Sequence, residues 1–327
     1  MVLSSHAGFL NAKSNPEVAK VLVTAPPLVN SSKEFEELAE FLNFDINWMK
    51  SSQVVSEADL LEIIGDYDGW IIGDDPCTRK VLQAGKSGSL KAIVKWGVGV
   101  DNLDLDSIKE FSIRFSNTPN VFGKEVADLA VAYLVNLSRQ TFYVHNEVMA
   151  GRWIKPLGIS LENMKVALIG LGDIGQNVLK RLTAADVETY AYEVDREKLK
   201  GLKNLNLKTW PDSISEVDAI IFTCSLSKEN YKMLDRNIIS ELKKGSFVIN
   251  VSRGGLISER DLEDALINGQ LGGAALDVYD TEPLPSSSRL KQCKNVILGS
   301  HNASNTIQAV KRASEEAFLR LNTFFQD

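Results

Sequence analysis

Short apolar runs alternate with amphipathic stretches along the chain from Lys20 onward. The apolar runs have the length of buried parallel strands, and the amphipathic stretches carry apolar residues at helical spacing. In the first part of the chain, strands are expected at 21–23, 46–48, 69–72 and 92–96. Ser31 and Ser56 are each followed three residues later by an acidic residue, which predicts the starts of two intervening helices. This alternation predicts a doubly wound parallel sheet with right-handed crossovers.

A second series of the same kind follows a long helix that we expect at about 124–144. Its strands are predicted at 166–169, 187–192, 219–223, 247–251, 274–277 and 296–298. A last helix, at about 306–325, comes after this second sheet and is expected to return to the first domain. We therefore predict an α/β protein of two doubly wound parallel-sheet domains. The first domain comprises residues 1–119, completed by 301–327, and the second comprises residues 120–300.

The first strand of the second domain leads into a glycine motif. Gly170, Gly172 and Gly175 have the G-x-G-x-x-G spacing, and the next strand ends in Glu193, roughly 20 residues further on. The first glycine permits a tight turn, the second lets the backbone approach a pyrophosphate, and the third lets the helix pack on the strand. A carboxylate after the second strand accepts hydrogen bonds from ribose hydroxyls. The pattern predicts a Rossmann dinucleotide-binding domain, and the alternative is a glycine turn in an ordinary βα unit.

Composition excludes several other classes. Hydrophobic residues make up 44% and charged residues 24%, as in ordinary globular proteins, and the net charge of −7 argues against a nucleic-acid-binding surface. No apolar run approaches the roughly 18 residues of a membrane helix. Residues 1–20 lack the features of a signal peptide, so we expect a mobile extension there. The three cysteines, Cys77, Cys224 and Cys293, have no metal-ligand spacing, which predicts no metal site and fits a cytoplasmic location.

Three ionisable residues follow strands of the second series: Arg253, Glu282 and His301. Ligands of open α/β sheets bind at the carboxyl ends of the strands, so these side chains can converge on one crevice. Arginine can hold a carboxylate through two parallel hydrogen bonds, and histidine can exchange a proton near neutral pH. A neighbouring carboxylate can orient the imidazole. Taken singly, each has a structural alternative: a packed histidine, a surface arginine and a turn acid.

These motifs together make the chain resemble the D-2-hydroxyacid dehydrogenases over nearly its whole length. The matching segments are VKWGVGVDNLDL at 94–105, TPNVFGKEVADLAVAYLV at 118–135, LIGLGDIG at 168–175, INVSRGGLI at 249–257, LGGAALDVYDTEPLP at 271–285 and SHNAS at 300–304. Several separate motifs in one order are far more specific than the glycine triplet alone. The resemblance implies a flavodoxin-like substrate domain, a Rossmann NAD-binding domain, and NAD as the cofactor.

The resemblance also implies roles for individual residues. Arg253, Glu282 and His301 would be catalytic, with His301 exchanging the substrate proton and Glu282 holding it in position. Substrate-binding residues would be Lys95, Val98, Gly99, Asn102 and Arg253. Besides the three glycines and Glu193, the cofactor-binding residues would be Asp173 and Ile174 at the pyrophosphate and Cys224, Ser225, Val251, Ser252 and Asp277 along the nicotinamide half.

Within the family, the chain most resembles 3-phosphoglycerate dehydrogenases, which would imply a role in serine biosynthesis; the alternative is a hydroxypyruvate/glyoxylate reductase. Against the first of these, Gly73-Asp74-Asp75 stands where those enzymes often place a phosphate-binding arginine. A carboxylate there would repel phosphate, and we expect Lys95 to replace the arginine in part. Glu193 favours NAD over NADP, although Arg196 and Lys198 leave dual use open.

Two readings of other classes stay open. The family includes members that act through partners, so the chain could be an NAD(H)-sensing corepressor or scaffold. A glycine-rich methyltransferase shares the strand–glycine–helix–acid opening but gives no role to Arg253, Glu282 and His301 together. The wide apolar band of the long helix, read with the family, predicts a homodimer; the alternative is a helix buried within one chain. No nucleic-acid or membrane partner is expected.

Overall fold

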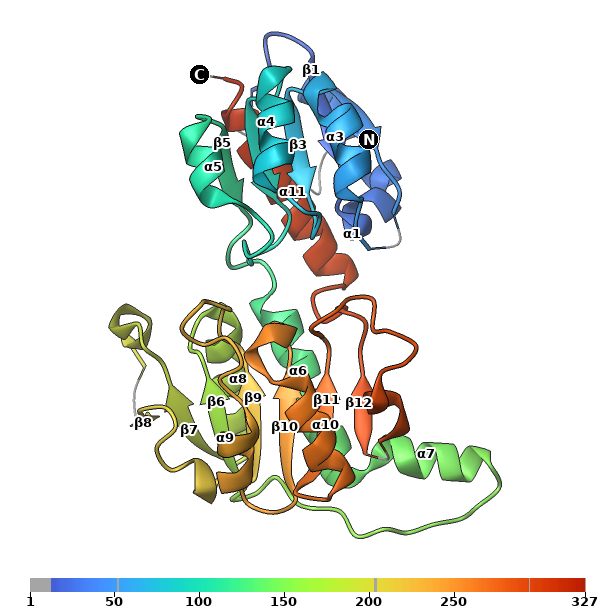
Figure 1. The fold of residues 1–327 in the computed structure, drawn as a ribbon, viewed down its shortest axis with the longest axis vertical. Coiled ribbons are helices and arrows are strands. Elements are labelled where there is room, and N and C mark those ends of the chain that lie inside the picture. Colours follow the sequence, from blue (N-terminus) through green and yellow to red (C-terminus); the bar gives the residue numbers. More distant parts are fainter. Residues whose placement is uncertain (1–12, 52, 203–204, 294, 327) are drawn as a thin grey trace. The chain divides into compact units, whose positions relative to one another are not determined.

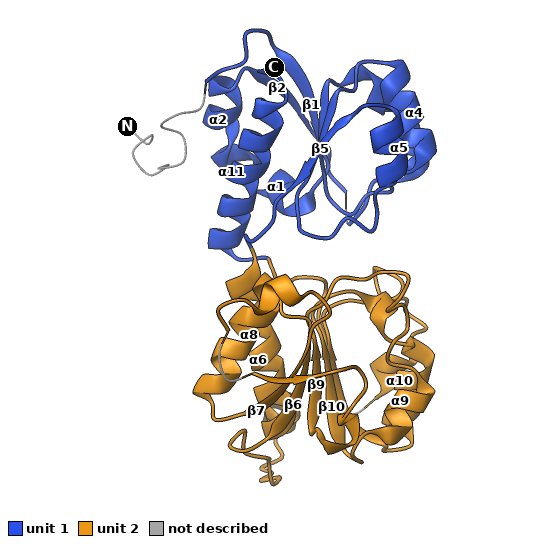
Figure 2. Cartoon of the chain, turned by 90° about the vertical axis from the view of Figure 1, so that its left-hand side faces the viewer, with its two compact units in different colours: residues 1–121, 305–327 blue, residues 122–304 orange. Residues whose placement is uncertain are grey.

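The computed structural model describes residues 13–51, 53–202, 205–293 and 295–326. The chain forms two compact units, shown separately coloured in Figure 2. Unit 1 comprises Met1–Val121 and Asn305–Asp327, and unit 2 comprises Phe122–Ser304. Unit 1 is therefore built from two segments that are far apart in the sequence.

Unit 1 contains a five-stranded parallel sheet in the order β2-β1-β3-β4-β5, which is the flavodoxin-like order. Its strands are β1 (Ala19–Val23), β2 (Phe44–Trp48), β3 (Gly69–Ile72), β4 (Ala92–Lys95) and β5 (Arg114–Asn117). Its α-helices are α1 (Pro26–Asn30), α2 (Glu36–Phe41), α3 (Glu57–Ile63), α4 (Arg79–Ser87), α5 (Leu105–Glu110) and α11 (Ile307–Thr323). Helix α11 packs on the sheet, and its Phe318 ring stacks on Phe35 and Phe44.

Unit 2 contains a seven-stranded parallel sheet in the order β12-β11-β10-β9-β6-β7-β8 (Figure 1). The strands are β6 (Lys165–Ile169), β7 (Glu188–Tyr192), β8 (Asn206–Lys208), β9 (Ala219–Phe222), β10 (Ser246–Asn250), β11 (Leu271–Leu276) and β12 (Val296–Leu298). The α-helices are α6 (Gly123–Arg139), α7 (Thr141–Met149), α8 (Asp173–Ala184), α9 (Arg236–Glu241) and α10 (Glu259–Ile267). The strand order reverses at β6, as it does in Rossmann sheets, so the predicted fold class is confirmed.

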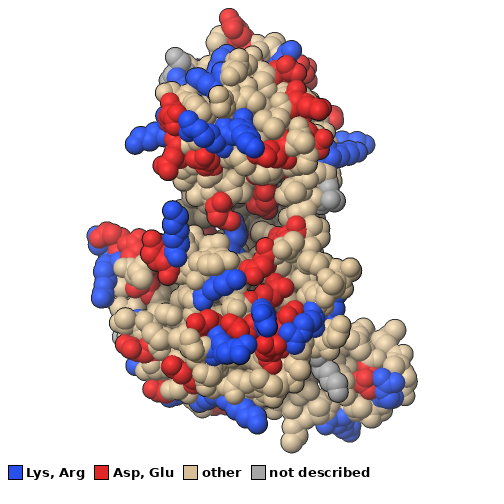
Figure 3. All heavy atoms as spheres, viewed as in Figure 1, with Lys and Arg blue, Asp and Glu red and all other residues tan. Residues whose placement is uncertain are grey.

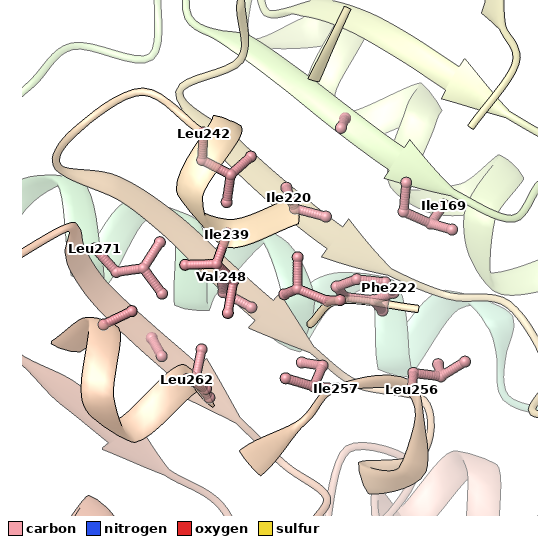
Figure 4. Packing of buried hydrophobic residues seen from close by; sticks show 14 of the residues in the cluster. Ile169, Ile220, Phe222, Ile239, Leu242, Val248, Leu256, Ile257, Leu262 and Leu271 are labelled. Atoms are coloured by element: carbon pink, nitrogen blue, oxygen red, sulfur yellow. The ribbon is translucent and has the colours of Figure 1, made fainter. Parts of the chain in front are cut away.

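The core of unit 2 lies between the central strands and the helices that cover one face of the sheet (Figure 4). Strand residues such as Ile220, Phe222 and Val248 meet Ile239 of α9 and Leu262 of α10. Because these strands are buried on both faces, their sequences are continuous apolar runs rather than alternating ones. This is why the strands of unit 2 were visible in the sequence.

Four local predictions differ from the structure. Ser31 does not cap an α-helix; Ser32–Glu34 is a 3-10 turn, and α2 starts after Phe35, whose ring is buried against Phe318. The single helix expected at 124–144 is two helices, because Gln140 adopts a left-handed conformation with φ of 54°. Strands β5 and β8 were not predicted.

The N-terminal extension predicted for residues 1–20 is wrong for its last residues. Residues 1–12 lie outside the described residues, whereas Asn15 is 4% exposed and donates its backbone N–H to the carbonyl of Leu42. Asn322 of α11 donates to the carbonyl of Lys13 at 2.9 Å. The segment from Lys13 onward is therefore part of unit 1.

Charged side chains of both signs are interspersed over the face drawn in Figure 3. Among the described residues, no helix is long and apolar enough to cross a membrane.

Candidate active site

The turn from β6 into α8 has the geometry that its glycine spacing predicts. Gly170 has a φ of 96°, and a Cβ there would lie 2.7 Å from the Cα of Cys224. A Cβ on Gly175 would lie 2.0 Å from the carbonyl oxygen of Gly170, so α8 packs directly on the turn. At Gly172, the N-cap of α8, a Cβ would have no described atom within 4 Å. The backbone at the start of α8 is therefore open to close approach, and this cradle fits a pyrophosphate.

Glu193 follows β7 and lies beside this turn. Its Oε2 accepts the backbone N–H of Leu171 at 2.7 Å, and its Oε1 accepts that of Asp195 at 2.9 Å. The Glu193 side chain is 4% exposed, and the ammonium of Lys198 lies 3.8 Å from Oε2. These bonds fix the carboxylate at the place where a dinucleotide ribose would lie.

Asp173, the first residue of α8, turns its carboxylate away from Gly172 and toward α6. A Cβ on Gly123 would lie 2.2 Å from Oδ2 of Asp173, and Asn177 donates its side-chain N–H to Oδ1 at 3.1 Å. The carboxylate thus lies at the N-terminus of α6, where the helix dipole stabilises a negative charge. Ile174, partly exposed, follows it in the first turn of α8. The side chain of Asp173 thus contacts α6, and its place at the pyrophosphate, through the backbone, stays a prediction.

The ends of β6, β9 and β10 are joined by hydrogen bonds. The hydroxyl of Thr223 donates to the carbonyls of Ile169 and Gly170 at 3.0 and 2.8 Å. The hydroxyl of Ser252 donates to the carbonyl of Cys224.

Three further predicted cofactor residues, Cys224, Ser225 and Val251, lie at the same strand ends. Val251 is buried, and the carbonyl of Ser225 accepts a hydrogen bond from the Asn230 side chain at 2.8 Å. Burial raises the pKa of the Cys224 thiol to about 11, so Cys224 is a neutral packing residue near pH 7. The predicted residues 224, 225, 251 and 252 are therefore brought together at one edge of the sheet.

His301 and Glu282 form the central contact of the site. Nδ1 of His301 lies 2.7 Å from Oε2 of Glu282, with both side chains about one-quarter exposed. The other oxygen of Glu282 accepts the backbone N–H of Tyr279 at 3.0 Å. A carboxylate held in this way fixes the ring orientation and stabilises an imidazolium, which makes His301 suited to proton exchange.

Arg253 lies on a loop adjacent to that of Glu282. Its guanidinium donates to the carbonyl of Ser252 at 2.9 Å, and its own carbonyl accepts the side-chain N–H of Asn250. A Cβ on the next residue, Gly254, would lie 2.0 Å from the carbonyl carbon of Tyr279. The two loops therefore touch through their backbones, and Arg253, Glu282 and His301 share one end of the unit 2 sheet.

Asp277 accepts hydrogen bonds from the backbone of the loop that carries His301. Its side chain is buried, and it accepts the backbone N–H groups of Asn302 and Ala303 at 3.1 and 2.8 Å. The backbone N–H of His301 donates to the carbonyl of Asp277 at 2.7 Å. Burial and the charge of Asp277 raise the pKa of the Tyr133 hydroxyl, which donates to that carboxylate. Sequence placed Asp277 along the nicotinamide; here its carboxylate holds the histidine loop.

The predicted substrate loop lies in unit 1, after β4. The backbone N–H of Gly97 donates to the Thr118 hydroxyl at 2.8 Å, and the carbonyl of Val98 accepts the Asn117 side chain at 2.9 Å. At the other end, the Asn102 side chain donates to the carbonyl of Asp75 at 2.7 Å. The loop is thus fixed at both ends, with Val98 43% exposed and Gly99 partly exposed between them.

Lys95 does not have the setting that was expected for a phosphate ligand. Lys95 is 1% exposed, and its ammonium donates to the Gly73 carbonyl at 2.5 Å and to Oδ1 of Asp74 at 2.6 Å. The positive charge is therefore already compensated by an internal carboxylate. The expectation that Lys95 replaces a phosphate-binding arginine is corrected by this ion pair.

Sequence reasoning missed two residues that organise the site. Tyr133 appeared only as an apolar position of a helix, and its hydroxyl contact with Asp277 has no local signal. Tyr279 donates its hydroxyl to the Gly299 carbonyl at 2.7 Å, which joins the β11 and β12 loops. Within the described residues, no group of three or more His, Cys, Asp or Glu side chains is placed to hold a metal ion.

Residues 131–303 match the model of a protein family described as D-isomer specific 2-hydroxyacid dehydrogenase, NAD binding domain. The glyoxylate reductase of Thermofilum pendens is 30% identical, over 81% of this chain and 80% of that protein. The glyoxylate reductase/hydroxypyruvate reductase of Mus musculus is 30% identical, over 88% of this chain and 89% of that protein. A D-3-phosphoglycerate dehydrogenase, from Methanocaldococcus jannaschii, is also 30% identical, over 90% of this chain and 55% of that protein.

Solved structures agree with these matches. The TT0316 protein from Thermus thermophilus superposes with a TM-score of 0.83 at 27% identity, covering 94% of this chain and 97% of that protein. The similarity therefore extends over both units.

Proposed function

The chain belongs to the D-isomer specific 2-hydroxyacid dehydrogenase family, and we propose that within it the chain reduces a small, unphosphorylated 2-oxoacid. The family makes the chain an NAD-dependent oxidoreductase. Our first preference from sequence, a 3-phosphoglycerate dehydrogenase type, is less well supported than the alternative, a glyoxylate/hydroxypyruvate reductase. Relatives with the latter activity are more numerous among the similar proteins.

The observation that carries the proposal is the 2.7 Å contact between His301 and Glu282. In the direction of reduction, His301 donates a proton to the 2-oxo oxygen, and the carboxylate of Glu282 stabilises the imidazolium before this transfer. In the direction of oxidation, the same imidazole accepts the hydroxyl proton. Bound NADH supplies the hydride for reduction, and bound NAD accepts it in oxidation.

In unit 2, we expect Arg253 to bind a substrate carboxylate; in unit 1, backbone N–H groups at Val98 and Gly99 are expected donors to the substrate. Arginine presents two parallel donors that match a carboxylate, and backbone donors on a loop fixed at both ends are already oriented. The glycine turn and Glu193 would hold the cofactor. Since the Glu193 carboxylate is fixed by two backbone N–H groups, we expect it to disfavour the 2′-phosphate of NADP.

We propose an unphosphorylated substrate because Lys95 forms an ion pair with Asp74. A cationic side chain binds a phosphate best when its charge is not compensated, and the Lys95 ammonium is 2.6 Å from a carboxylate oxygen. The loop that precedes α4 therefore supplies a negative charge at the position where phosphoglycerate-type enzymes would need a positive one.

The proposal is tested by following NADH oxidation with glyoxylate, hydroxypyruvate, phosphohydroxypyruvate, pyruvate and 2-oxoglutarate. We expect glyoxylate or hydroxypyruvate to give the highest kcat/KM. A preference for phosphohydroxypyruvate would restore the phosphoglycerate assignment. Tight NADH binding without turnover of any of these acids would favour the NAD-sensing alternative.

We further propose that the chain is a homodimer. Apolar side chains of α7 and the segment after it are exposed in unit 2: Phe142, Met149, Trp153, Leu157 and Ile159. Figure 1 shows α7 extending outward from unit 2. An apolar surface of this kind is typical of a subunit interface. The cytoplasmic location stays a prediction.

A further inference from the structure

The ammonium of Lys95 is an unusual group because it is charged, buried and placed at the carboxyl end of the unit 1 sheet. Its side chain is 2% exposed, whereas that of its partner Asp74 is 39% exposed. The ammonium is thus shielded from solvent, whereas the carboxylate that it contacts is partly exposed. A buried ammonium requires such a partner, because burying an isolated charge is strongly unfavourable.

The ion pair is joined to the loop that we assign to substrate binding. A Cβ on Gly97 would lie 3.3 Å from Cε of Lys95, so the lysine stem runs directly under this loop. The Asn102 side chain donates to the Gly73 carbonyl at 3.2 Å, and the same carbonyl accepts the Lys95 ammonium. Gly73, Asp74, Lys95 and Asn102 therefore form one cluster, called here the Lys95 cluster.

A second acid, Asp75, lies beside this cluster and interacts electrostatically with Lys95. Asp75 is buried and accepts hydrogen bonds from the Thr24 hydroxyl and from the backbone N–H groups of Val55 and Gly73. Burial raises the pKa of Asp75, the reverse of what a strong ion pair would do. The direct partner of the ammonium is Asp74.

We propose that Asp74 is a specificity-determining residue, which excludes 2-oxoacids bearing a second anionic group by neutralising Lys95. This inference rests on the proposed function. In the wild-type protein, an anionic substituent approaching the Lys95 cluster meets the exposed carboxylate before the ammonium. The attraction of the substituent to Lys95 and its repulsion from Asp74 largely cancel. A second anionic group on the substrate therefore gains no binding free energy from this cluster, and it loses its hydration.

Removing the Asp74 charge leaves the attraction of an anionic substituent to Lys95 without the opposing repulsion. The ammonium of Lys95 then lacks the carboxylate that it contacts directly, and an anionic group of the substrate can take that place. A phosphate or carboxylate on carbon 3 of the substrate would take the place of the missing side chain. The same substitution gives no comparable advantage to an uncharged substituent.

The experiment compares hydroxypyruvate with phosphohydroxypyruvate, which differ only by the phosphate. We expect Asp74→Asn to raise the ratio of kcat/KM for phosphohydroxypyruvate to that for hydroxypyruvate by about tenfold or more, or about 1.4 kcal/mol. Asp45→Asn is the matched control, because Asp45 is an exposed residue of β2 and its substitution changes the net charge equally. Ionic strength is held constant, since salt screens such effects.

A double variant, Asp74→Asn with Lys95→Met, tests whether the ammonium is the cause; the gain should disappear. If Asp74→Asn fails to fold, as judged by circular dichroism, Asp74→Ser tests the same charge.

An unchanged ratio in a folded Asp74 variant overturns this inference alone, and so does a gain that survives Lys95→Met. An equal loss on both substrates shows a structural role and overturns it too. A wild-type protein that reduces glyoxylate but neither of these two acids overturns this inference alone, and one that reduces none of the five 2-oxoacids overturns the proposed function with it.

Discussion

Two groups of the loop after β11, the Asp277 carbonyl and the Glu282 carboxylate, fix the orientation of His301. Its φ of 55° is unusual for a residue other than glycine, and the backbone bond to the Asp277 carbonyl helps to hold that conformation. Glu282 then fixes the ring. The imidazole is thus positioned by two groups of the loop that follows β11.

Replacing His301 with alanine should lower kcat by ~10²–10⁴-fold, the usual contribution of a positioned acid–base group. Binding of NADH, followed by its fluorescence, should be largely unchanged because His301 is not part of the glycine turn. His145→Ala is a suitable control, since His145 is exposed on α7. Near-normal turnover of His301→Ala would exclude the proposed role.

Glu193→Gln should raise the KM for NADH by about tenfold or more, because a hydrogen bond to a charged group contributes about 1.5–3 kcal/mol. It should also reduce the preference for NADH over NADPH. Glu188→Gln, an exposed change on the same strand, should leave both values unaltered. Steady-state kinetics with each cofactor provide the measurement, and an unchanged NADH/NADPH ratio would contradict the assignment.

Cys224 should alkylate slowly at neutral pH despite its place beside the glycine turn. With its pKa at about 11, its thiolate fraction should rise about tenfold for each pH unit from 7 to 10. Peptide mapping after iodoacetamide treatment distinguishes Cys224 from Cys293. Rapid alkylation at pH 7 would show that the thiol is not buried as described.

At this scale, sequence predicted the residues with a fixed spacing or a motif, such as Gly172, Glu193 and His301. It could not predict the partners of Lys95 and Asp277. The Lys95–Asp74 contact joins two strand ends across the sheet, and the Asp277 carboxylate meets backbone N–H groups of a loop after the next strand. Such contacts depend on the fold rather than on local sequence.

At the scale of elements, helix starts depend on single side chains. The Thr306 hydroxyl accepts the backbone N–H of Ala309 at 3.1 Å and caps α11, the helix that closes unit 1. The equivalent contact at α3 is made by the Ser56 hydroxyl, which accepts the backbone N–H of Asp59 at 3.1 Å, as its sequence predicted. These caps satisfy N–H groups that a helix leaves without an internal partner.

Thr306→Ala should lower the free energy of unfolding of unit 1 by about 1 kcal/mol, the usual loss for a helix cap. Urea denaturation followed by circular dichroism measures this change. Thr323→Ala, an exposed change at the other end of the same helix, should cost less than about 0.5 kcal/mol. Equal effects of the two substitutions would argue against the cap.

Most elements were predicted because buried parallel strands are continuous apolar runs. Strand β5 was missed because its sequence, RFSN, is polar and half-exposed at the sheet edge. The break between α6 and α7 was missed because Gln140, rather than the usual glycine, takes the left-handed conformation. Ser31 failed as a cap because the burial of Phe35 sets where α2 starts.

At the scale of the whole molecule, the proposed homodimer can be measured directly. Analytical ultracentrifugation should give twice the mass of one chain. Trp153→Asp with Leu157→Asp should shift the protein toward the monomer, since these side chains are 79% and 94% exposed in unit 2. Ile267→Asp, at another exposed apolar position, should leave the mass unchanged. A monomeric wild-type protein would remove the dimer proposal.

Unit 1 is assembled from two separated segments, and this has a consequence for biosynthesis. Unit 2 is continuous, so all of its strands have been synthesised before α11 is translated. The unit 1 sheet emerges first but lacks the helix that supplies Phe318 and Leu321 to its core. Its apolar face therefore stays uncovered while some 180 residues of unit 2 are synthesised, and chaperones can bind the face during this time. A released chain that ends before Ile307 should expose that face to limited proteolysis, whereas its unit 2 should be resistant.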